Sequence, residues 1–501
     1  MADIVTPVVE ALTAPDLAGV VDLVAHPDPH GAPGEAVIVA HATGRVRLTL
    51  DADGTERHEV LAGRDPVADT DPLAFLPYDL EQIDPSPANA TNAYPEPARR
   101  LLGFFSDPDR SPDLAIVHTP GHYFPEYGGH RGEHGSLDVI QSRAPFILSG
   151  AGVPRRGVVD GYAHVVDVTP TLLRAAGVDE RFHADAAGEP LDGRARTDLL
   201  EAGAGRYVIG ILWDGGHCSD LLHLAAQGTL PNVARLIEHG TALRGGAVAE
   251  FPSVTLCNHT SALTGVGPGR HGVLGNVFYD RAQRRRILAN DETTWHRSAE
   301  WFRPSVATVF EMLTRADPDA TSACVDEAID RGATASTMQL IRAAGGNDGG
   351  GALDAALPPA EDSPYLGNRA HLADSYYRFC SRVDDIGVLQ MQQHWASAAV
   401  APRLTWWSNI VTDAGHHAGG PRSAIARDSL MDADRRLGAL FDHLDALGVT
   451  EDVTFLMTAD HGFETADPRV RGDWKGRLDD VSARLGVGFR DEGPGLVYLD
   501  V

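Results

Sequence analysis

Five residues that commonly bind metal ions follow three separate short apolar runs of this 501-residue chain. Carboxylate oxygens and imidazole nitrogens suit zinc, manganese and iron. A single Asp after a strand is more often a helix cap or part of a turn, but recurrence at three places makes that explanation insufficient. The pattern predicts a metal centre assembled from distant parts of the chain. The five residues are Asp214, Asp413, His417, Asp460 and His461.

A candidate nucleophile, Thr255, lies in the sequence Phe-Pro-Ser-Val-Thr-Leu-Cys-Asn-His at 251–259. Helical sequence follows at 260–264, so Thr255 is expected where a helix begins. Backbone N–H groups and the helix dipole favour a bound phosphate at such a position. Two adjacent cations would lower the pKa of the Thr255 hydroxyl and stabilise charge on a phosphoryl oxygen. The combination predicts phosphoryl transfer; the alternative is that Thr255 only caps the helix.

The elements expected to position these residues alternate between short buried strands and helices. Apolar runs at 207–212, 404–407 and 453–457 predict strands, and helical periodicity occurs at 305–315 and 371–399. Buried strands separated by helices indicate an α/β fold with a mostly parallel sheet covered on both faces. Such sheets carry their sites at the carboxyl ends of the strands, and the predicted ligands follow the strands at that edge.

The first part of the chain also alternates between strands and helices. A Pro- and Asp-rich stretch at 65–97 is expected to be a surface loop, and 182–205, rich in Asp, Ala and Gly, a linker. The expected helices are 2–12 and 166–176, and the expected strands are 36–40, 45–50, 113–117, 145–148 and 495–501.

These motifs resemble the nucleotide pyrophosphatase/phosphodiesterase branch of the alkaline phosphatase superfamily. The likeness rests on 251–265, on Gly-Asn at 275–276 and on the Asp and His motifs, which follow in the family's order. It implies an alkaline-phosphatase-like sheet, two zinc ions, with manganese or iron as other candidates, and a covalent phosphothreonine. By that likeness Asp214, Thr255, Asp460 and His461 hold one metal, Asp413 and His417 hold the other, and Asn276 binds a phosphoryl oxygen.

The family's last ligand for the second metal has its counterpart near the front of this chain. The usual Gly-x-His-Gly motif lies well downstream of the Asp-His pair, but only forty residues follow His461. The motif occurs instead at His134, and 144–152 and 166–173 resemble the segments that ordinarily close the domain. The neighbouring residues His118, His122 and His130 are spare candidates for this ligand.

This displacement implies a circular permutation. Residues 1–181 would be the family's carboxyl-terminal portion, 182–205 the linker, and 206–501 the amino-terminal portion, with a small cap insertion at about 290–400. Both portions would form one catalytic domain. The termini of domains often lie close together, so such a rearrangement is physically feasible.

Several nearby residues have more than one interpretation. His416 is expected to point away from the metals, because two consecutive side chains rarely reach one ion. Cys257 is expected to be a buried helix residue rather than a reactive thiol. The sequence does not separate a pocket role from simple packing for His217, His259 and His271.

We therefore expect a metal-dependent phosphohydrolase that cleaves phosphodiester or nucleotide pyrophosphate bonds. One alternative is a hydrolase of carbon–phosphorus bonds like phosphonoacetate hydrolase, because 275–280 is also similar to that relative. That enzyme grips its substrate carboxylate with lysines, whereas the only lysine here is Lys475. A second alternative is a non-catalytic protein that binds a phosphate ligand.

The amino-acid composition limits the classes of molecule that the protein is expected to bind. The net charge of −28 repels nucleic acid and anionic membranes, so a small phosphate ester or nucleotide is the expected substrate. No run is apolar enough for a membrane span or a secretion signal, which predicts a cytoplasmic location. Four widely spaced cysteines suggest neither disulfides nor a thiolate zinc site. The sequence leaves the oligomeric state open.

Overall fold

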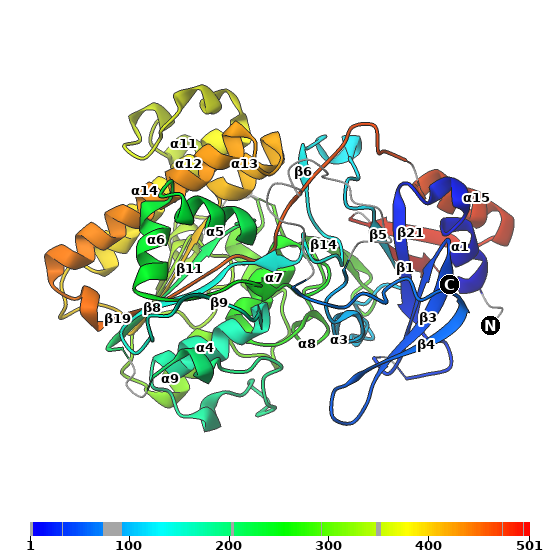
Figure 1. Cartoon of the computed structure of the whole chain (residues 1–501), viewed down its shortest axis with the longest axis horizontal. Coiled ribbons are helices and arrows are strands. Elements are labelled where there is room, and N and C mark those ends of the chain that lie inside the picture. The colour runs from blue at the N-terminus through cyan, green and yellow to red at the C-terminus, as the bar shows by residue number, and fades with distance from the viewer. Residues whose placement is uncertain are drawn as a thin grey trace.

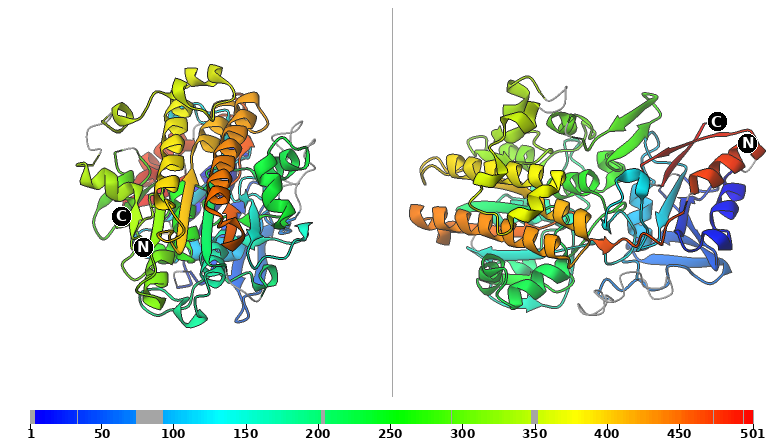
Figure 2. Two further views of the ribbon diagram at one scale, coloured as in Figure 1. Left: turned by 90° about the vertical axis from the view of Figure 1, so that its left-hand side faces the viewer. Right: turned by 90° about the horizontal axis from the view of Figure 1, so that it is seen from above.

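The structure, a computed structural model, describes residues 4–32, 34–73, 93–201, 205–291, 293–346, 352–472, 474–493 and 495–500. The chain forms two large β-sheets with helices packed on them (Figure 1). One sheet has eight strands and carries the predicted ligands, and the other has seven strands and contains both ends of the chain. Figure 2 shows the two lobes from two further directions.

The eight-stranded sheet has the order β17-β16-β18-β11-β19-β8-β12-β9. Every neighbouring pair is parallel except the two made by β8, which runs antiparallel to β19 and β12. The predicted mostly parallel sheet is therefore confirmed. The strands are β8 Phe146–Gly150, β9 Gly157–Val159, β11 Tyr207–Trp213, β12 Gly240–Leu243, β16 Ser322–Val325, β17 Ala335–Ser336, β18 Leu404–Asn409 and β19 Val453–Thr458.

Helices cover both faces of this sheet. Because successive strand residues point to opposite faces, Val208 and Leu212 of β11 pack in one core, whereas Ile209 and Ile211 pack in another. The first core includes residues of α4 and α9, and the second includes residues of α5, α6, α12 and α14. These helices are α4 Val168–Ala175, α5 Cys218–Ala226, α6 Pro231–Glu238, α9 Val309–Ala316, α12 Ser375–His394 and α14 Ala424–Leu447.

The seven-stranded sheet is antiparallel throughout, with the order β21-β22-β5-β1-β2-β3-β4. Strands near both chain ends meet in it, since β22 pairs with β5. Two helices from opposite ends of the chain, α1 and α15, share a core on one face. The elements are β1 Val21–Pro27, β2 Val37–His41, β3 Gly44–Leu50, β4 Glu56–Gly63, β5 Leu114–His118, β21 Gly488–Glu492, β22 Leu496–Asp500, α1 Val5–Leu12 and α15 Trp474–Leu485.

One hydrophobic core joins the two sheets. It contains Val37 and Val117 of the seven-stranded sheet and Val208 and Leu456 of the eight-stranded sheet. Helix α3 (Pro97–Phe104) contributes Leu101 to the same core. The two sheets are therefore packed through a continuous interior.

The expected elements of the first part are present with shifted ends, but the sequence did not reveal that most of its strands form a second sheet. The helix expected at 166–176 begins as a 3-10 turn at Val165–Asp167 and continues as α4. Of the expected loop at 65–97, residues 74–92 lie outside the described residues, as do 202–204 of the expected linker. The described part of that linker has two short 3-10 turns and no α-helix.

The stretch at 290–400, expected as a cap, contributes to the sheet itself. Strands β16 and β17 lie at one edge of the eight-stranded sheet, and α12 covers a face of it. Strands of four and two residues are too short to show a clear periodicity, which explains why these two were not expected.

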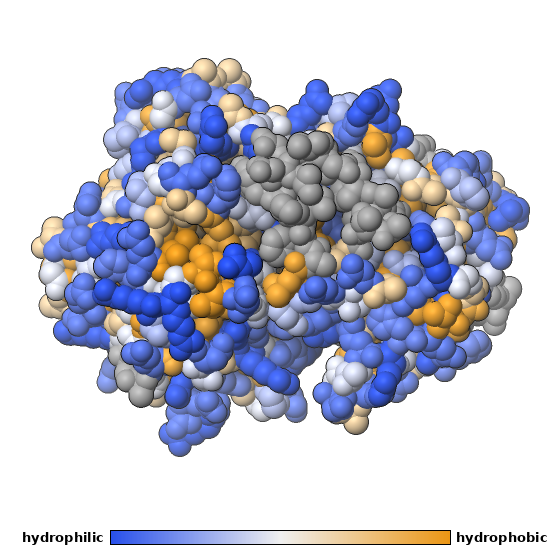
Figure 3. Space-filling view, viewed as in Figure 1, coloured by the Kyte–Doolittle hydropathy of each residue, from blue (hydrophilic) through white to orange (hydrophobic). Residues whose placement is uncertain are grey.

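Most of the face seen in Figure 1 is hydrophilic, as an excess of acidic residues requires (Figure 3). Apolar residues gather on this face over the region of α5 and α6. Within the described ranges, no helix has the length and apolar character that crossing a membrane would require.

Candidate active site and metal centre

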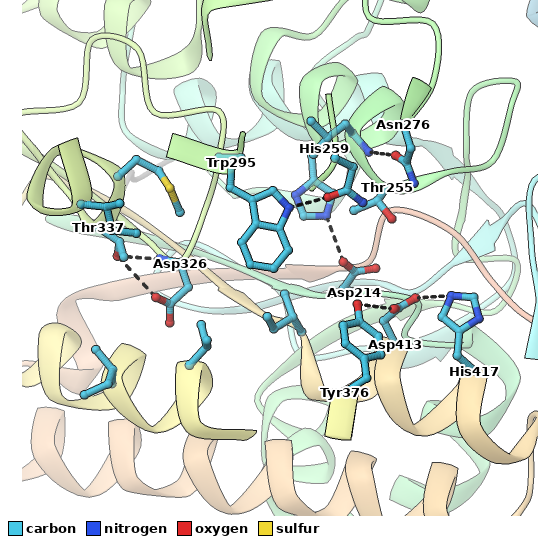
Figure 4. Close-up of a pocket in the computed structure, with 18 of the residues that line it drawn as sticks. Asp214, Thr255, His259, Asn276, Trp295, Asp326, Thr337, Tyr376, Asp413 and His417 are labelled. Atoms are coloured by element: carbon cyan, nitrogen blue, oxygen red, sulfur yellow. Dashed lines mark hydrogen bonds and ion pairs between the residues drawn. The ribbon is translucent and has the colours of Figure 1, made fainter. Parts of the chain in front are cut away.

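The predicted ligands meet at one edge of the eight-stranded sheet, beside a cavity of about 270 Å³ (Figure 4). Asp214 follows β11, and α13 (Val411–Gly419), which comes after β18, carries Asp413 and His417. Asp460 and His461 follow β19. Because β11 is a parallel neighbour of both β18 and β19, the carboxyl ends of these strands place the five residues together.

A residue from the first part of the chain reaches the same edge. Strand β6 (Gly132–Glu133) pairs antiparallel with β20 (Glu464–Thr465), close to the end of β19. The ring centroid of His134 is 3.7 Å from that of His461 and 5.1 Å from that of His417. The structure thus brings His134 to the residues with which it was predicted to act, across more than 270 positions of sequence.

One group of candidate metal ligands consists of Asp214, Asp460 and His461, whose ligand atoms all lie within 4.8 Å of one another. His461 Nε2 is 3.1 Å from Asp460 Oδ2 and 3.7 Å from Asp214 Oδ1. All three atoms are buried without a hydrogen-bond partner among the described residues. His461 Nδ1 lies 3.0 Å from the Gly462 carbonyl oxygen, so donation there leaves Nε2 free to bind a cation.

A second group consists of His134, Asp413 and His461, again within 4.8 Å of one another. His417 adjoins it, with Nε2 3.3 Å from Asp413 Oδ1. Nδ1 of His134 and Nδ1 of His417 each lie near a backbone carbonyl oxygen, at 3.0 and 2.9 Å, which leaves both Nε2 atoms available as ligands. His461 therefore lies between the two predicted ligand sets rather than in one alone.

Thr255 is the first residue of α7 (Thr255–Thr264) and lines the same cavity as Asp214 and Asp413. It is nearly buried, with 9% of its surface exposed. The backbone N–H of Leu256 donates to Asn276 Oδ1 at 3.0 Å, which fixes the Asn276 side chain beside the start of the helix (Figure 4). The amide NH₂ of Asn276 is then oriented away from Leu256 and available to an acceptor in the cavity.

Residues 208–484 match the family model of the type I phosphodiesterases/nucleotide pyrophosphatases. The matched span is more than half of the chain. The chain belongs to this family. The match includes Asp214, Thr255 and His461 but not His134, which lies outside the matched residues.

Solved structures with distant similarity include two kinds of hydrolase. Murine ectonucleotide pyrophosphatase/phosphodiesterase 5, an inactive form in complex with AMP, is 16% identical, with a TM-score of 0.37, over 53% of this chain and 59% of that chain. Phosphonoacetate hydrolase from Sinorhizobium meliloti, in complex with phosphonoformate, is 22% identical, with a TM-score of 0.34, over 54% of this chain and 59% of that one. The chain spans less than two thirds of the length of either structure.

The pKa values at this site are shifted because three carboxyl groups lie close together in a buried space. Burial, followed by the charges of Asp460 and Asp413, raises the pKa of Asp214 well above its usual range. Burial alone would lower the pKa of His417, but the Asp413 carboxylate outweighs it and raises that pKa to about 9. Like charges held this close are costly unless a cation lies between them, so the residues present fit a metal centre.

The sequence did not reveal the partner of His259, a residue for which it left pocket and packing roles open. His259 Nδ1 lies 2.8 Å from Glu327 Oε2, and its Nε2 lies 3.5 Å from Asp460 Oδ2 and 3.8 Å from Asp214 Oδ2. Glu327 is fully buried and also accepts from the Trp406 indole N–H and the Ser408 hydroxyl. A carboxylate behind a histidine that faces metal ligands orients the ring, so His259 belongs to the site.

A third group of possible metal ligands lies at the outer side of the second one and consists of His130, Glu133 and His417. The ring centroids of His130 and His417 are 4.2 Å apart, and His130 Nδ1 is 3.7 Å from Glu133 Oε1. His417 is shared between the groups, so a cation bound there would compete with one bound by His134 and Asp413. His130 was only a spare candidate in the sequence.

The other residues near the motifs lie outside the cavity wall. His416 turns toward Asp220, with Nε2 3.9 Å from Asp220 Oδ2, as expected for the neighbour of a ligand. Cys257 is a fully buried residue of α7, also as expected. His217 and His271 are fully buried and do not line the cavity, and His271 Nε2 lies 3.0 Å from the Ser261 hydroxyl.

Proposed function

We propose that this protein is a metal-dependent phosphohydrolase that cleaves phosphodiester or nucleotide pyrophosphate bonds through a covalent phosphothreonine. The observation that carries the proposal is the convergence of buried, unpartnered ligand atoms on the cavity where Thr255 begins α7. These atoms include Asp214 Oδ1, Asp413 Oδ1, Asp460 Oδ2 and His461 Nε2. None of these atoms has a hydrogen-bond partner among the described residues, and a bound cation would satisfy them.

Two metal ions would be held by the seven predicted ligands, with zinc the first choice and manganese or iron compatible with the same donors. When bound, the ions would supply Lewis acidity toward the Thr255 hydroxyl and the phosphoryl oxygens. His461 belongs to both candidate groups of metal ligands, so the orientation of its ring affects both metal sites. The seven ligands are Asp214, Thr255, Asp460, His461, Asp413, His417 and His134.

The protein's own groups divide the reaction between them. The Thr255 oxygen attacks phosphorus and forms the phosphothreonine, while the leaving group, an alcohol from a diester or a phosphate from a pyrophosphate, takes up the proton that the hydroxyl loses. Water then attacks the same phosphorus, and the Thr255 oxygen leaves and takes up a proton from that water. Asn276 donates its amide N–H to a nonbridging phosphoryl oxygen, and the amino end of α7 favours the negative charge there. The buried position of Thr255 limits competing water at the first step.

The alternative reaction on a phosphonate with a carboxylate group is disfavoured by charge. Among the described residues that line the cavity, none is Lys or Arg. A carboxylate placed there would face Asp214, Asp413 and a further acidic residue, with no lysine or arginine to bind it. Of the proposed substrates, a phosphodiester with a single negative charge is therefore a better fit than a nucleotide pyrophosphate.

The test is turnover of bis-p-nitrophenyl phosphate by the full chain before and after chelation, with zinc, manganese or iron restored. We expect activity to disappear with the chelator and return with metal. Thr255→Ala should reduce the rate by about 1,000-fold or more while the protein keeps most of its metal, since one ligand of seven is lost. Thr264→Ala, a buried hydroxyl in the same helix, should leave the rate within a few-fold.

Two results would overturn the proposal. Wild-type rates that survive complete metal removal would exclude the metal-dependent mechanism. A Thr255→Ala variant with unchanged activity would exclude the phosphothreonine. If diesters, monoesters and phosphonates all fail to react with every metal, the alternative of a non-catalytic phosphate-binding protein gains support.

We also propose that the chain is a circular permutation of the family order. The proposal is supported by β8, which precedes the family match in sequence yet pairs with β19 inside the same sheet. It is also supported by β22, near the end of the chain, which pairs with β5 near its front. Both chain ends lie in the same lobe (Figure 1).

Relinking tests this proposal directly. A short Gly-Ser linker would join the two ends, and new ends would be opened within 182–205, which would restore the family order. We expect the relinked protein to fold, to bind the same number of metal ions and to keep its rate within about tenfold, because the strand contacts are retained. Loss of folding in several linker lengths would contradict it.

A further inference from the structure

We propose that the part of the cavity remote from the metal-ligand residues binds an alcohol group that carries an amine or ammonium. Preferred substrates would then be phosphate esters with one cationic organic substituent, rather than esters with further negative charge. The inference rests on the proposed phosphohydrolase function and names a substrate class for it.

The remote part of the cavity is built mainly from apolar side chains. They come from the loop after β16, from α10 (Thr337–Ala343), from α12 and from nearby loops. Such walls favour an organic group over a hydrated second phosphate. The apolar and aromatic residues that line this part are Trp295, Ala328, Met338, Leu340, Ile341, Leu357, Val383, Ile386 and Ile410.

One carboxyl group interrupts this apolar wall. Asp326 directly follows β16 at the edge of the sheet, and only 8% of its surface is exposed. Its backbone φ is 53°, in the left-handed region that residues other than Gly rarely adopt. Asp is one of the few residue types besides Gly that adopt this conformation, so the informative feature is the burial of an acid beside a cavity, which is costly unless a partner offsets it.

The Asp326 carboxyl group is poorly satisfied by the protein. The Thr337 hydroxyl lies 3.4 Å from Asp326 Oδ1, but the same hydroxyl is much closer to Gln390 Oε1, at 2.5 Å, and has one proton to donate. Asp326 Oδ2 is buried without a hydrogen-bond partner. No cationic side chain among the described residues lies within 4.0 Å of the group.

Helix α12 packs directly against this carboxyl group. A Cβ at Gly387 of α12 would lie 2.0 Å from Asp326 Oδ2 and 2.9 Å from Trp407 Nε1, so Gly is required for the helix to pack there. Burial, followed by the charge of Asp384, raises the pKa of Asp326 well above its usual range. A ligand cation would offset this cost by providing the charge that the protein lacks.

An aromatic ring adds a second feature that suits a cation. Trp295 lines the cavity, and its indole N–H donates to Asn290 at 2.6 Å, which fixes the ring. Figure 4 shows Trp295 between Asp326 and the side of the cavity that holds Asp214 and Asp413. An indole attracts ammonium groups, and a desolvated cation–π contact contributes roughly 0.5–2 kcal/mol.

The experiment compares two diesters of the same shape with the zinc-loaded full chain. One is p-nitrophenyl phosphocholine, and the other is p-nitrophenyl 3,3-dimethylbutyl phosphate, in which carbon replaces the charged nitrogen. We expect kcat/KM to be higher for the cationic ester by about tenfold. Asp326→Asn should bring the ratio close to one, because Asn keeps the shape, tolerates positive φ and removes the charge.

Control variants separate charge from structure. Asp362→Asn removes an exposed carboxylate in a 3-10 turn outside the cavity wall and should keep the wild-type ratio. Trp295→Leu should reduce the ratio several-fold, and it provides a second variant if Asp326→Asn does not fold. Melting temperatures of all variants would show that the fold is retained.

The cation site can also be tested by a binding measurement that does not depend on turnover. Benzyltrimethylammonium should bind the metal-free wild-type protein at least about tenfold more tightly than Asp326→Asn in a calorimetric titration. Equal kcat/KM for the two esters, or a preference that Asp326→Asn leaves unchanged, would overturn the inference while the phosphohydrolase proposal stands. Hydrolysis of neither ester would count against the phosphohydrolase, and the titration would then decide the cation site alone.

Discussion

The two ends of the cavity are built in different ways. At the metal-ligand end, the candidate ligands come mainly from turns and a helix that follow parallel strands, and three carboxyl groups lie among histidines. At the remote end, helices α10 and α12 supply apolar walls around a single acid, Asp326. In the proposed function, the charged groups of the reaction would therefore lie at the edge of the sheet, whereas the helices packed beside it would bind the organic group.

We expect substitutions at the two ends of the cavity to have different effects on metal content and on substrate preference. Loss of a histidine or carboxylate ligand should lower metal content and lower activity for every substrate. A change at the remote end should alter the ranking of substrates and leave metal content intact. The following variants test this division, from the largest expected effect to the smallest.

His134→Ala should have the largest effect. We expect the affinity for one of two metal ions to fall by about 100-fold or more, because a nitrogen ligand is removed from the group it shares with Asp413 and His461. Metal analysis after dialysis against graded chelator measures this. His130→Ala is the matched control, and if it lowers metal content more than His134→Ala does, the second ion lies in the outer group with Glu133.

Glu327→Gln should have an intermediate effect at the same end. The change weakens the contact that orients His259 toward Asp214 and Asp460, so we expect the affinity of the first metal to fall by about tenfold. Competition with a fluorescent zinc chelator measures it. Glu250→Gln, a buried carboxylate paired with Arg99 away from the cavity wall, should alter stability without altering zinc affinity. Equal zinc affinity in wild type and Glu327→Gln would remove His259 from the site.

Tyr376→Phe tests the boundary between the two ends. The Tyr376 hydroxyl donates to Asp413 Oδ2 at 3.1 Å, and its ring lines the cavity. Loss of this hydrogen bond should lower kcat/KM by about three- to tenfold for cationic and neutral esters alike. The adjacent Tyr377→Phe removes a buried bond to Asp432 and should cost about 1–2 kcal/mol of stability while the rate is retained. An effect on one ester class alone would place Tyr376 at the recognition end.

Asp326→Asn should have the smallest effect on stability, and that effect should depend on pH. The pKa of Asp326 is raised in the folded protein, so its contribution to stability is present below the unfolded-state pKa of about 4 and is lost as pH rises through the folded-state pKa. Asn does not titrate. The melting temperature of the variant relative to wild type should therefore increase between pH 5 and 9, and a difference independent of pH would show that Asp326 is not held as a buried acid.

The sequence predicted the metal-ligand end better than the remote end for a physical reason. Asp214, Asp413 and Asp460 each follow an apolar run that can only be a buried strand, so their meeting at one sheet edge follows from the parallel topology. Glu327 and Asp326 follow a strand of only four residues, too short to give a periodic signal. Their roles became visible only through contacts with α7 and α12.

The seven-stranded sheet also has contacts that could not be predicted from the sequence. Strands β2 and β3 correspond to the strands predicted at 36–40 and 45–50. That β22, at the other end of the chain, would join the same sheet through β5 was not predicted, because pairing between remote strands leaves no mark in either segment alone.

The sequence by itself determined the α/β class and indicated the candidate ligands and the candidate nucleophile, since apolar periodicity and residue chemistry are local properties. Only the tertiary structure decided that His134 stacks on His461, that Glu327 supports His259, and that Asp326 lies unpaired in an apolar wall. Those relations depend on distance and desolvation between segments remote in sequence, and both are set by packing.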